Sequence, residues 1–150
     1  MSIRVSYNNL SKVLEQRILS RIEKYQPDDP RLREGLTRIG IMIEREAKKN
    51  ITQKKLVDTG SLLNSIRFRL FQKGTISGVK VGSYGIPYAA VHEFGFDGSV
   101  KISSHERRTP SGGVTNVTAH QRMMQIRARP YLKPAIKSVR KEIINILKGL

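Results

Sequence analysis

The chain has 150 residues, and its 28 Lys and Arg residues against 12 Asp and Glu residues give a formal net charge of +16. The length suits one domain, which we expect to span residues 1–150, and the absence of Cys excludes disulfides and thiolate metal sites. No apolar run approaches the roughly 20 residues of a transmembrane helix, and residues 1–6 lack the apolar core of a signal peptide.

The first third of the sequence predicts a short strand and two helices. Residues 3–7 alternate weakly, and residues 10–25 repeat apolar side chains at helical spacing. Asp29 followed by Pro30 predicts the start of a second helix, which a polar stretch over residues 50–55 follows. Its glycines, Gly35 and Gly40, are expected to weaken it slightly or to let another backbone approach. Its apolar stripe consists of Leu32, Leu36, Ile39, Ile43 and Ala47.

A compact motif, Asp58-Thr59-Gly60-Ser61, follows this segment. Apolar residues come next at helical spacing, so we expect a short helix over about residues 60–66, anchored to the core by that spacing. Asp58 or Thr59 would accept a hydrogen bond from its free N–H groups, and Gly60 would keep the helix start uncrowded.

The middle of the chain predicts a hairpin and a short helix. Residues 67–73 and 79–82 alternate like half-buried strands, and residues 74–78 supply a turn. Residues 87–95 have proline near the start and glycine at the end, which favours a short helix.

Residues 96–124 are too long for an ordinary loop. Residues 100–102 and 114–117 are predicted to form two sides of an extended hairpin with residues 110–113 at its tip. We expect this arm to contact a neighbouring subunit. Its candidate interface residues are Val100, Ile102, Arg107, Arg108, Val114 and Val117.

Residues 126–129 are predicted to form a returning strand, and Pro130 and Pro134 to mark the start of a final helix that reaches Leu150. Together the elements predict an α+β fold, in which N-terminal and C-terminal helices pack on a small, mostly antiparallel sheet that carries a long arm.

The candidate chemistry is weak. Asp58-Thr59-Gly60 is also the signature of an aspartic protease, but such an enzyme is nearly all β and would need a dimer to pair two carboxylates. His92-Glu93 lacks the second histidine of a zinc-protease helix, because Phe96 stands in its place. We therefore expect no enzyme activity, metal or cofactor, and a structural or interface role for His92 and Glu93.

Three blocks of sequence resemble phage tail-completion and head–tail joining proteins, also described as neck, minor tail or virion morphogenesis proteins. The blocks are residues 57–66, residues 81–83 with 88–95, and residues 128–135. Their family-motif residues are Asp58, Thr59, Gly60, Leu62, Ser65, Ile66, Gly82, Tyr88, His92, Glu93, Gly95, Arg129, Pro130, Leu132 and Pro134.

The resemblance implies a non-enzymatic subunit of a hexameric ring at the top of the tail tube, where it completes the tail for head–tail joining. It implies tail-tube or tail-terminator proteins and head connector proteins as partners, DNA contact in the lumen, and assembly into the virion in the host cytoplasm. The positive charge favours anionic partners, so a nucleic-acid-binding protein is one alternative, although aromatic residues make up only 6% of the chain. The dimeric protease is the other.

Overall fold

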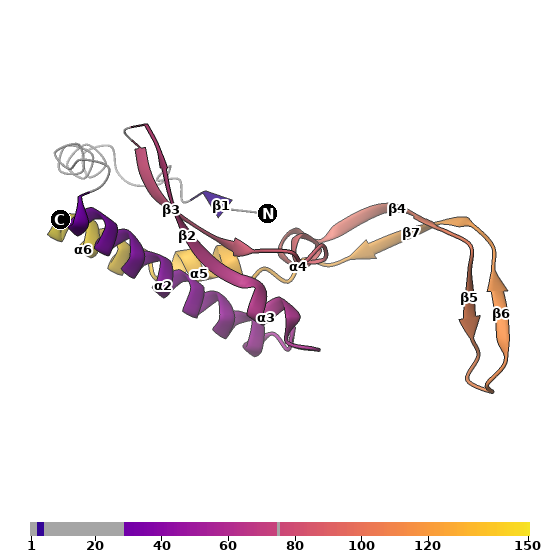
Figure 1. The fold of residues 1–150 in the computed structure, drawn as a ribbon. Coiled ribbons are helices and arrows are strands. Elements are labelled where there is room, and N and C mark those ends of the chain that lie inside the picture. The colour runs from indigo at the N-terminus through magenta and orange to yellow at the C-terminus, as the bar shows by residue number, and fades with distance from the viewer. Residues whose placement is uncertain (1–2, 5–28, 75) are drawn as a thin grey trace.

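The computed structural model describes residues 3–4, 29–74 and 76–150, which form a body and a projecting arm (Figure 1). The body contains β1 (Ile3–Arg4), α2 (Pro30–Gln53), α3 (Ser61–Ser65), β2 (Ile66–Lys73), β3 (Ile76–Ser83), α4 (Ala89–Phe94), α5 (Leu132–Ser138) and α6 (Arg140–Gly149). The arm contains β4 (Phe96–Ile102), β5 (His105–Arg108), β6 (Val114–Val117) and β7 (His120–Ile126). The predicted α+β class is confirmed, whereas the helix predicted over residues 10–25 lies outside the described residues.

Helix α2 is the central element of the body. Its start is the predicted one, because the Asp29 side chain accepts a hydrogen bond from the N–H of Arg31 at 2.8 Å and Pro30 is the first helical residue. It ends at Gln53, four residues later than the predicted end at Lys49. Ile51 continues the buried stripe through the stretch that we expected to be polar, and its side chain is fully buried.

The sheet of the body has the order β1-β3-β2 and is antiparallel throughout. Ile66, Val79 and Val81 are buried on the face that α2 covers. The Phe68 ring lies so close to Gly40 that a Cβ there would be 2.6 Å from it. Gly40 therefore admits a side chain of β2 rather than another backbone, and at Gly35 the close neighbours are likewise side chains, those of α6 and Leu150.

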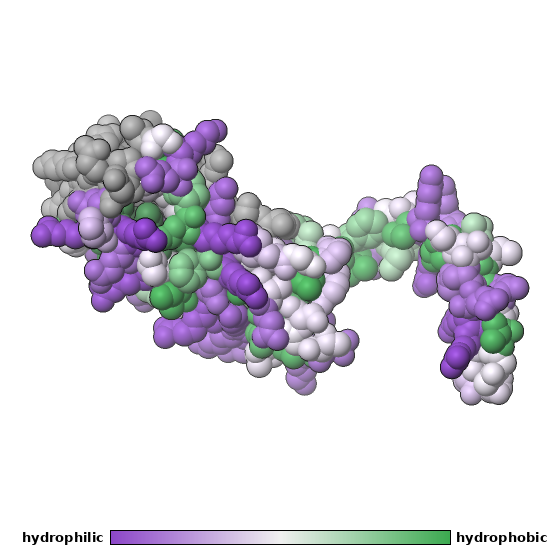
Figure 2. Space-filling view, viewed as in Figure 1, coloured by the Kyte–Doolittle hydropathy of each residue, from purple (hydrophilic) through white to green (hydrophobic). Residues whose placement is uncertain are grey.

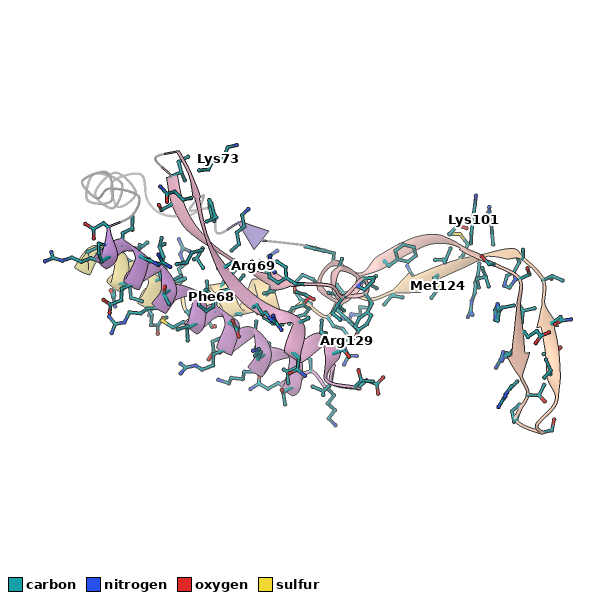
Figure 3. All side chains as sticks on the ribbon, in the orientation of Figure 1. Phe68, Arg69, Lys73, Lys101, Met124 and Arg129 are labelled. Atoms are coloured by element: carbon teal, nitrogen blue, oxygen red, sulfur yellow. The ribbon has the colours of Figure 1, made fainter. Side chains whose placement is uncertain are left out.

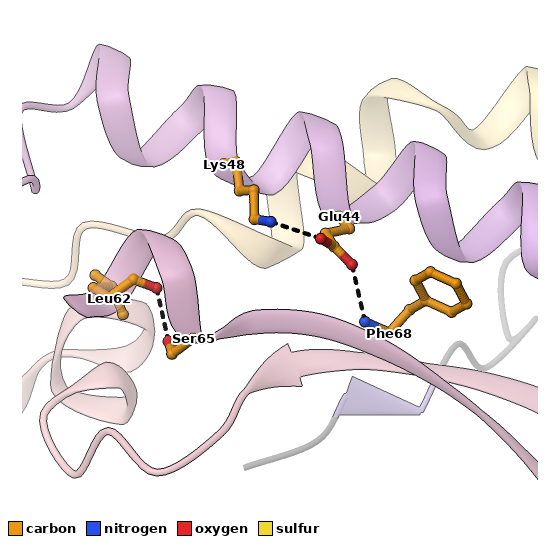
Figure 4. Close-up of polar contacts among 5 residues, drawn as sticks. All are labelled: Glu44, Lys48, Leu62, Ser65 and Phe68. Atoms are coloured by element: carbon orange, nitrogen blue, oxygen red, sulfur yellow. Dashed lines mark hydrogen bonds and ion pairs between the residues drawn. The ribbon is translucent and has the colours of Figure 1, made fainter. Parts of the chain in front are cut away.

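One hydrogen bond protects the free edge of β2. The backbone N–H of Phe68 donates to Oε2 of Glu44 at 3.1 Å, and Lys48 holds the other carboxylate oxygen at 2.6 Å (Figure 4). Part of the unpaired edge is thereby satisfied from α2.

The end of the chain departs from the prediction in two places. β7 ends at Ile126, so residues 127–129 do not form the expected strand. The final helix is broken at Val139 into α5 and α6, although most of the predicted stripe is buried. Both helices contact α2, and this contact closes the core.

Candidate functional site

A buried carboxylate joins two segments that are far apart in the sequence. Glu93 lies in α4 with 4% of its surface exposed, and it accepts three backbone hydrogen bonds. The N–H groups of Tyr131 and Leu132 donate to Oε2 at 2.8 and 2.9 Å, and that of Lys133 donates to Oε1 at 2.9 Å. These are free N–H groups at the start of α5, which has no side-chain cap of its own. Glu93 therefore acts as the N-terminal cap of α5 from another segment of the chain.

Tyr131 lies beside this carboxylate and is almost fully buried. Burial, and then the nearby negative charge of Glu93, raise the pKa of its phenol to about 12. Its OH is 3.5 Å from the carbonyl oxygen of Ala89, so the ring closes the space between α4 and α5.

A second buried polar contact joins the helix α3 to the sheet. The Ser65 hydroxyl donates to the carbonyl of Leu62 at 2.7 Å (Figure 4), and the Oγ atoms of Ser65 and Ser83 are 2.7 Å apart. Because the Ser65 proton is used on Leu62, Ser83 is the donor in that pair. Leu62 and Ile66 are buried beside it.

Of the two capping residues that the sequence predicted, Thr59 accepts a hydrogen bond from an N–H group at the start of α3, whereas Asp58 does not cap the helix. α3 begins at Ser61, and its N-cap is Gly60, which has a φ of 80° and makes no side-chain cap hydrogen bond. The Thr59 hydroxyl accepts a long hydrogen bond from the N–H of Ser61, at 3.4 Å, and Asp58 is exposed. Gly60 is thus the residue on which the turn depends, because its left-handed backbone disfavours a side chain.

The third block is attached to the end of α2 by a set of backbone contacts. The N–H of Arg129 donates to the carbonyl of His92 at 2.7 Å, and its guanidinium donates to the carbonyl of Lys54. Lys54 Nζ donates to the carbonyl of Pro130 at 2.6 Å. Pro134 is the third residue of α5, where its missing N–H removes no helical hydrogen bond.

Gly95 allows the arm to leave α4. It has a φ of 78°, and a Cβ there would be 2.8 Å from the carbonyl oxygen of Ile126. Both its conformation and its close contact therefore require glycine. His92 makes an edge-to-face contact with Tyr88, at 5.7 Å between ring centroids.

The arm consists of two two-stranded antiparallel sheets, one after the other along the same hairpin. β4 pairs with β7 and β5 pairs with β6, so the predicted tip is confirmed. The predicted pairing of residues 100–102 with residues 114–117 is wrong, because residues 100–102 pair with residues 120–122, and residues 114–117 pair with residues 105–108. A single long hairpin with a bend after Ile102 replaces the simpler one (Figure 1).

One face of the β4–β7 hairpin is largely apolar. The register places Val100 and Ile102 on the same face as Phe96, and it pairs Phe96 with Ile126 and Gly98 with Met124. Arg122 and His120, the partners of Val100 and Ile102, are the polar residues of this face. The other face carries mostly polar residues, namely Asp97, Ser99, Lys101, Gln121 and Gln125, with Met123 among them. Figure 2 shows green, apolar atoms along this part of the arm, which projects away from the body, and Figure 3 labels Lys101 and Met124 on it.

The base of the arm combines apolar and polar residues. An open hollow of about 520 Å³ lies there, lined by residues 94–97 and 125–128. Phe94 beside it is 61% exposed. The predicted interface residues Arg107, Arg108 and Val114 are also exposed, and Val117 is half-buried.

Residues 3–4, 29–74 and 76–150 contain no cluster of His, Asp and Glu that could hold a metal ion. None of the helices in these same ranges is long and apolar enough to cross a membrane. Comparisons of the chain with protein-family models, curated proteins and solved structures give no significant match.

Proposed function

We propose that this chain is a non-enzymatic structural subunit that assembles with copies of itself through the arm. The observation that carries the proposal is the uncovered apolar face of the β4–β7 hairpin. An isolated two-stranded hairpin is marginally stable in water, and an apolar face needs a second layer. In the part of the chain that the structure describes, no other element covers this face.

A second copy of the chain is the occupant that fits best. An arm that reaches beyond its own body can contact a different surface of the next copy, and such heterologous contacts generate a closed ring when the rotation between copies closes. The arm also has unpaired strand edges, which can add to the sheet edge of a neighbour.

The sequence resemblance gives this assembly its place. The three blocks that resemble phage tail-completion and head–tail joining proteins meet in the body through Glu93, Ser65 and Ser83. On that basis we infer a hexameric ring at the top of a tail tube, in contact with tail-tube or terminator and connector proteins. Its location would be the virion, after assembly in the host cytoplasm.

The geometry around Asp58 favours this role over a protease. Asp58 is exposed in the turn between α2 and α3, rather than in a loop between strands over a dimeric sheet. An aspartic protease would need the Asp58 carboxylates of two copies to lie a few ångströms apart.

The test is to remove the arm without disturbing the body. Asp97 and Gln125 are directly paired, so replacing residues 98–124 by Asn-Gly closes the hairpin with a two-residue turn. We expect the shortened chain to keep the circular dichroism spectrum of the body and to form no rings in electron micrographs, whereas the full chain forms six-fold rings. Rings formed by the shortened chain would refute the proposal.

A further inference from the structure

The face of the sheet that points away from α2 is strongly basic. Arg67, Arg69 and Lys73 lie on this face of β2, with Phe71 between the last two, and Lys80 on β3 is directly opposite Arg69. Partners in an antiparallel pair share a face, so all four cations lie on the same side. Figure 3 labels Arg69 and Lys73 along β2, with Phe68 on the side of α2.

Two of these cations are held in place by aromatic rings. The Arg69 guanidinium lies 4.1 Å from the centre of the Tyr84 ring, and Lys80 Nζ lies 4.8 Å from that of Phe71. The Phe71 ring also lies over Gly78, where a Cβ would be 2.6 Å from it. Both rings therefore hold a cationic side chain of this face, and each ring face is already in contact with that side chain.

The positive charge of this face is not compensated locally. β2 and β3 contain no Asp or Glu, and like charges stand directly opposite each other at Arg69 and Lys80. Among the described residues, none of the four cations forms an ion pair with a carboxylate. Like charges at directly paired positions destabilise a sheet, and a bound anion would relieve this repulsion.

We propose that this face binds the sugar–phosphate backbone of double-stranded DNA. A ladder of cations suits a regular polyanion, since alternate residues of a strand are about 6.8 Å apart and each DNA strand presents a phosphate about every 3.4 Å along the axis. Gly82 on β3 has no side chain opposite Arg67, so a rod-shaped ligand can approach the backbone there.

Duplex DNA fits this face better than single-stranded nucleic acid. Binding of single strands depends on aromatic rings that are free to stack on bases. Here the rings of Phe71 and Tyr84 carry Lys80 and Arg69. The site therefore contacts phosphates without reading sequence. This inference does not depend on the proposed assembly, because the four cations belong to the body of one subunit.

The experiment measures fluorescence anisotropy of the full chain with a labelled 30-base-pair duplex at several salt concentrations. Four phosphate contacts predict a slope of log Kobs against log salt of about −3.6. The variant Arg67→Glu/Lys73→Glu changes two cations that make no contact with an aromatic ring. We expect it to bind on the order of 50-fold more weakly at 0.1 M salt, with the slope flattened by about 1.8.

The matched control is Arg33→Glu/Arg45→Glu on α2, which changes the net charge by the same amount at two exposed positions. It should bind DNA within about threefold of the unaltered chain, since its cations do not line the face. Equal weakening by both variants, tighter binding of a single strand of the same length, or equal competition by poly-glutamate would each overturn the proposal. The assay is repeated with Val100→Asp, the variant that we expect to remain monomeric. Since the four cations belong to one subunit, this variant should still bind DNA, which distinguishes a failure of assembly from a failure of DNA binding.

Discussion

The β2–β3 hairpin of the body and the β4–β7 hairpin of the arm have similar lengths and the same antiparallel pairing, but among the described residues only the first is covered by a second layer. β2 and β3 place their apolar face on α2, where Val81 is 2% exposed. In the arm, the equivalent apolar face has Ile126 36% exposed and Met124 half-buried. Local sequence is sufficient to pair two strands, but the layer that stabilises a hairpin has to come from elsewhere.

The same contrast holds for polar groups. The body buries Glu93, Ser65 and Ser83 and satisfies each with hydrogen bonds, so that its segments are fixed relative to one another. The side-chain hydrogen bonds of the arm involve exposed residues, such as that between Gln125 and Asp97. We therefore expect the body to unfold as one cooperative unit and the arm to contribute little to its stability.

The largest expected effect on stability is at Glu93 in the body, compared with Glu106 in the arm. Glu93→Ala leaves three N–H groups at the start of α5 without their acceptor, and we expect it to lower the free energy of unfolding by about 3 kcal/mol. Glu106→Ala in the exposed strand β5 of the arm is the control, and it should change the free energy of unfolding by less than about 0.5 kcal/mol. Urea unfolding monitored by circular dichroism measures both, and equal losses would contradict the division between body and arm.

A second effect appears only at alkaline pH. Burial and Glu93 raise the pKa of Tyr131 from 10.0 to about 12, so the folded state retains a proton that the unfolded state loses. The resulting stability is fully present below pH 10 and is lost as the pH rises from 10 to 12, by an amount on the order of 2–3 kcal/mol.

Tyr131→Phe should remove this part of the pH dependence. We expect the variant and the unaltered chain to differ little at pH 7, and the variant to lose less stability between pH 10 and pH 12. The measurement is urea unfolding across this range. Parallel curves for the two proteins would show that the buried phenol does not contribute.

A smaller effect compares two glycines with left-handed backbones. Gly60 in the body has a φ of 80°, and Gly112 at the arm tip has a φ of 84°. Alanine at position 60 should lower body stability by about 1–2 kcal/mol, because a side chain is strained in this conformation. Alanine at position 112 has the same strain but should leave the unfolding of the body unchanged, with faster hydrogen exchange confined to the tip. A similar loss at both positions would mean that the arm unfolds with the body.

The smallest expected effect is at Asp58. Because its carboxylate does not cap α3, Asp58→Asn should change the free energy of unfolding by less than about 0.5 kcal/mol. The alternative protease hypothesis predicts instead that this substitution abolishes a peptide-cleaving activity. A peptidase assay on the unaltered chain and the variant distinguishes the two.

The sequence predicts the elements whose causes are local. The start of α2 at Asp29 and Pro30, the hairpin after Ile66 and the tip at residues 109–113 follow from caps, alternation and turn residues. The end of α2 could also have been found, because Ile51 continues the four-residue spacing of Ile43 and Ala47.

The contacts that fix the site are not local, and the sequence alone does not give them. Glu93 and Tyr131 are separated by 38 positions, and a carboxylate that accepts backbone N–H groups has no sequence pattern. One signal was present: α5 begins after Pro130 and Tyr131, with no Ser, Thr, Asp or Asn to cap it, so its acceptor has to come from another segment. The basic face of the sheet likewise depends on the register that pairs Arg69 with Lys80.

The most direct test of the central claim is the native mass of the full chain and two variants of adjacent arm residues. Val100→Asp places a charge on the apolar face of β4, and Ser99→Asp places the same charge on the opposite face. We expect the unaltered chain and Ser99→Asp to form the same closed hexamer, and Val100→Asp to remain monomeric. A monomeric unaltered chain, or assembly by Val100→Asp equal to that by Ser99→Asp, would contradict the account.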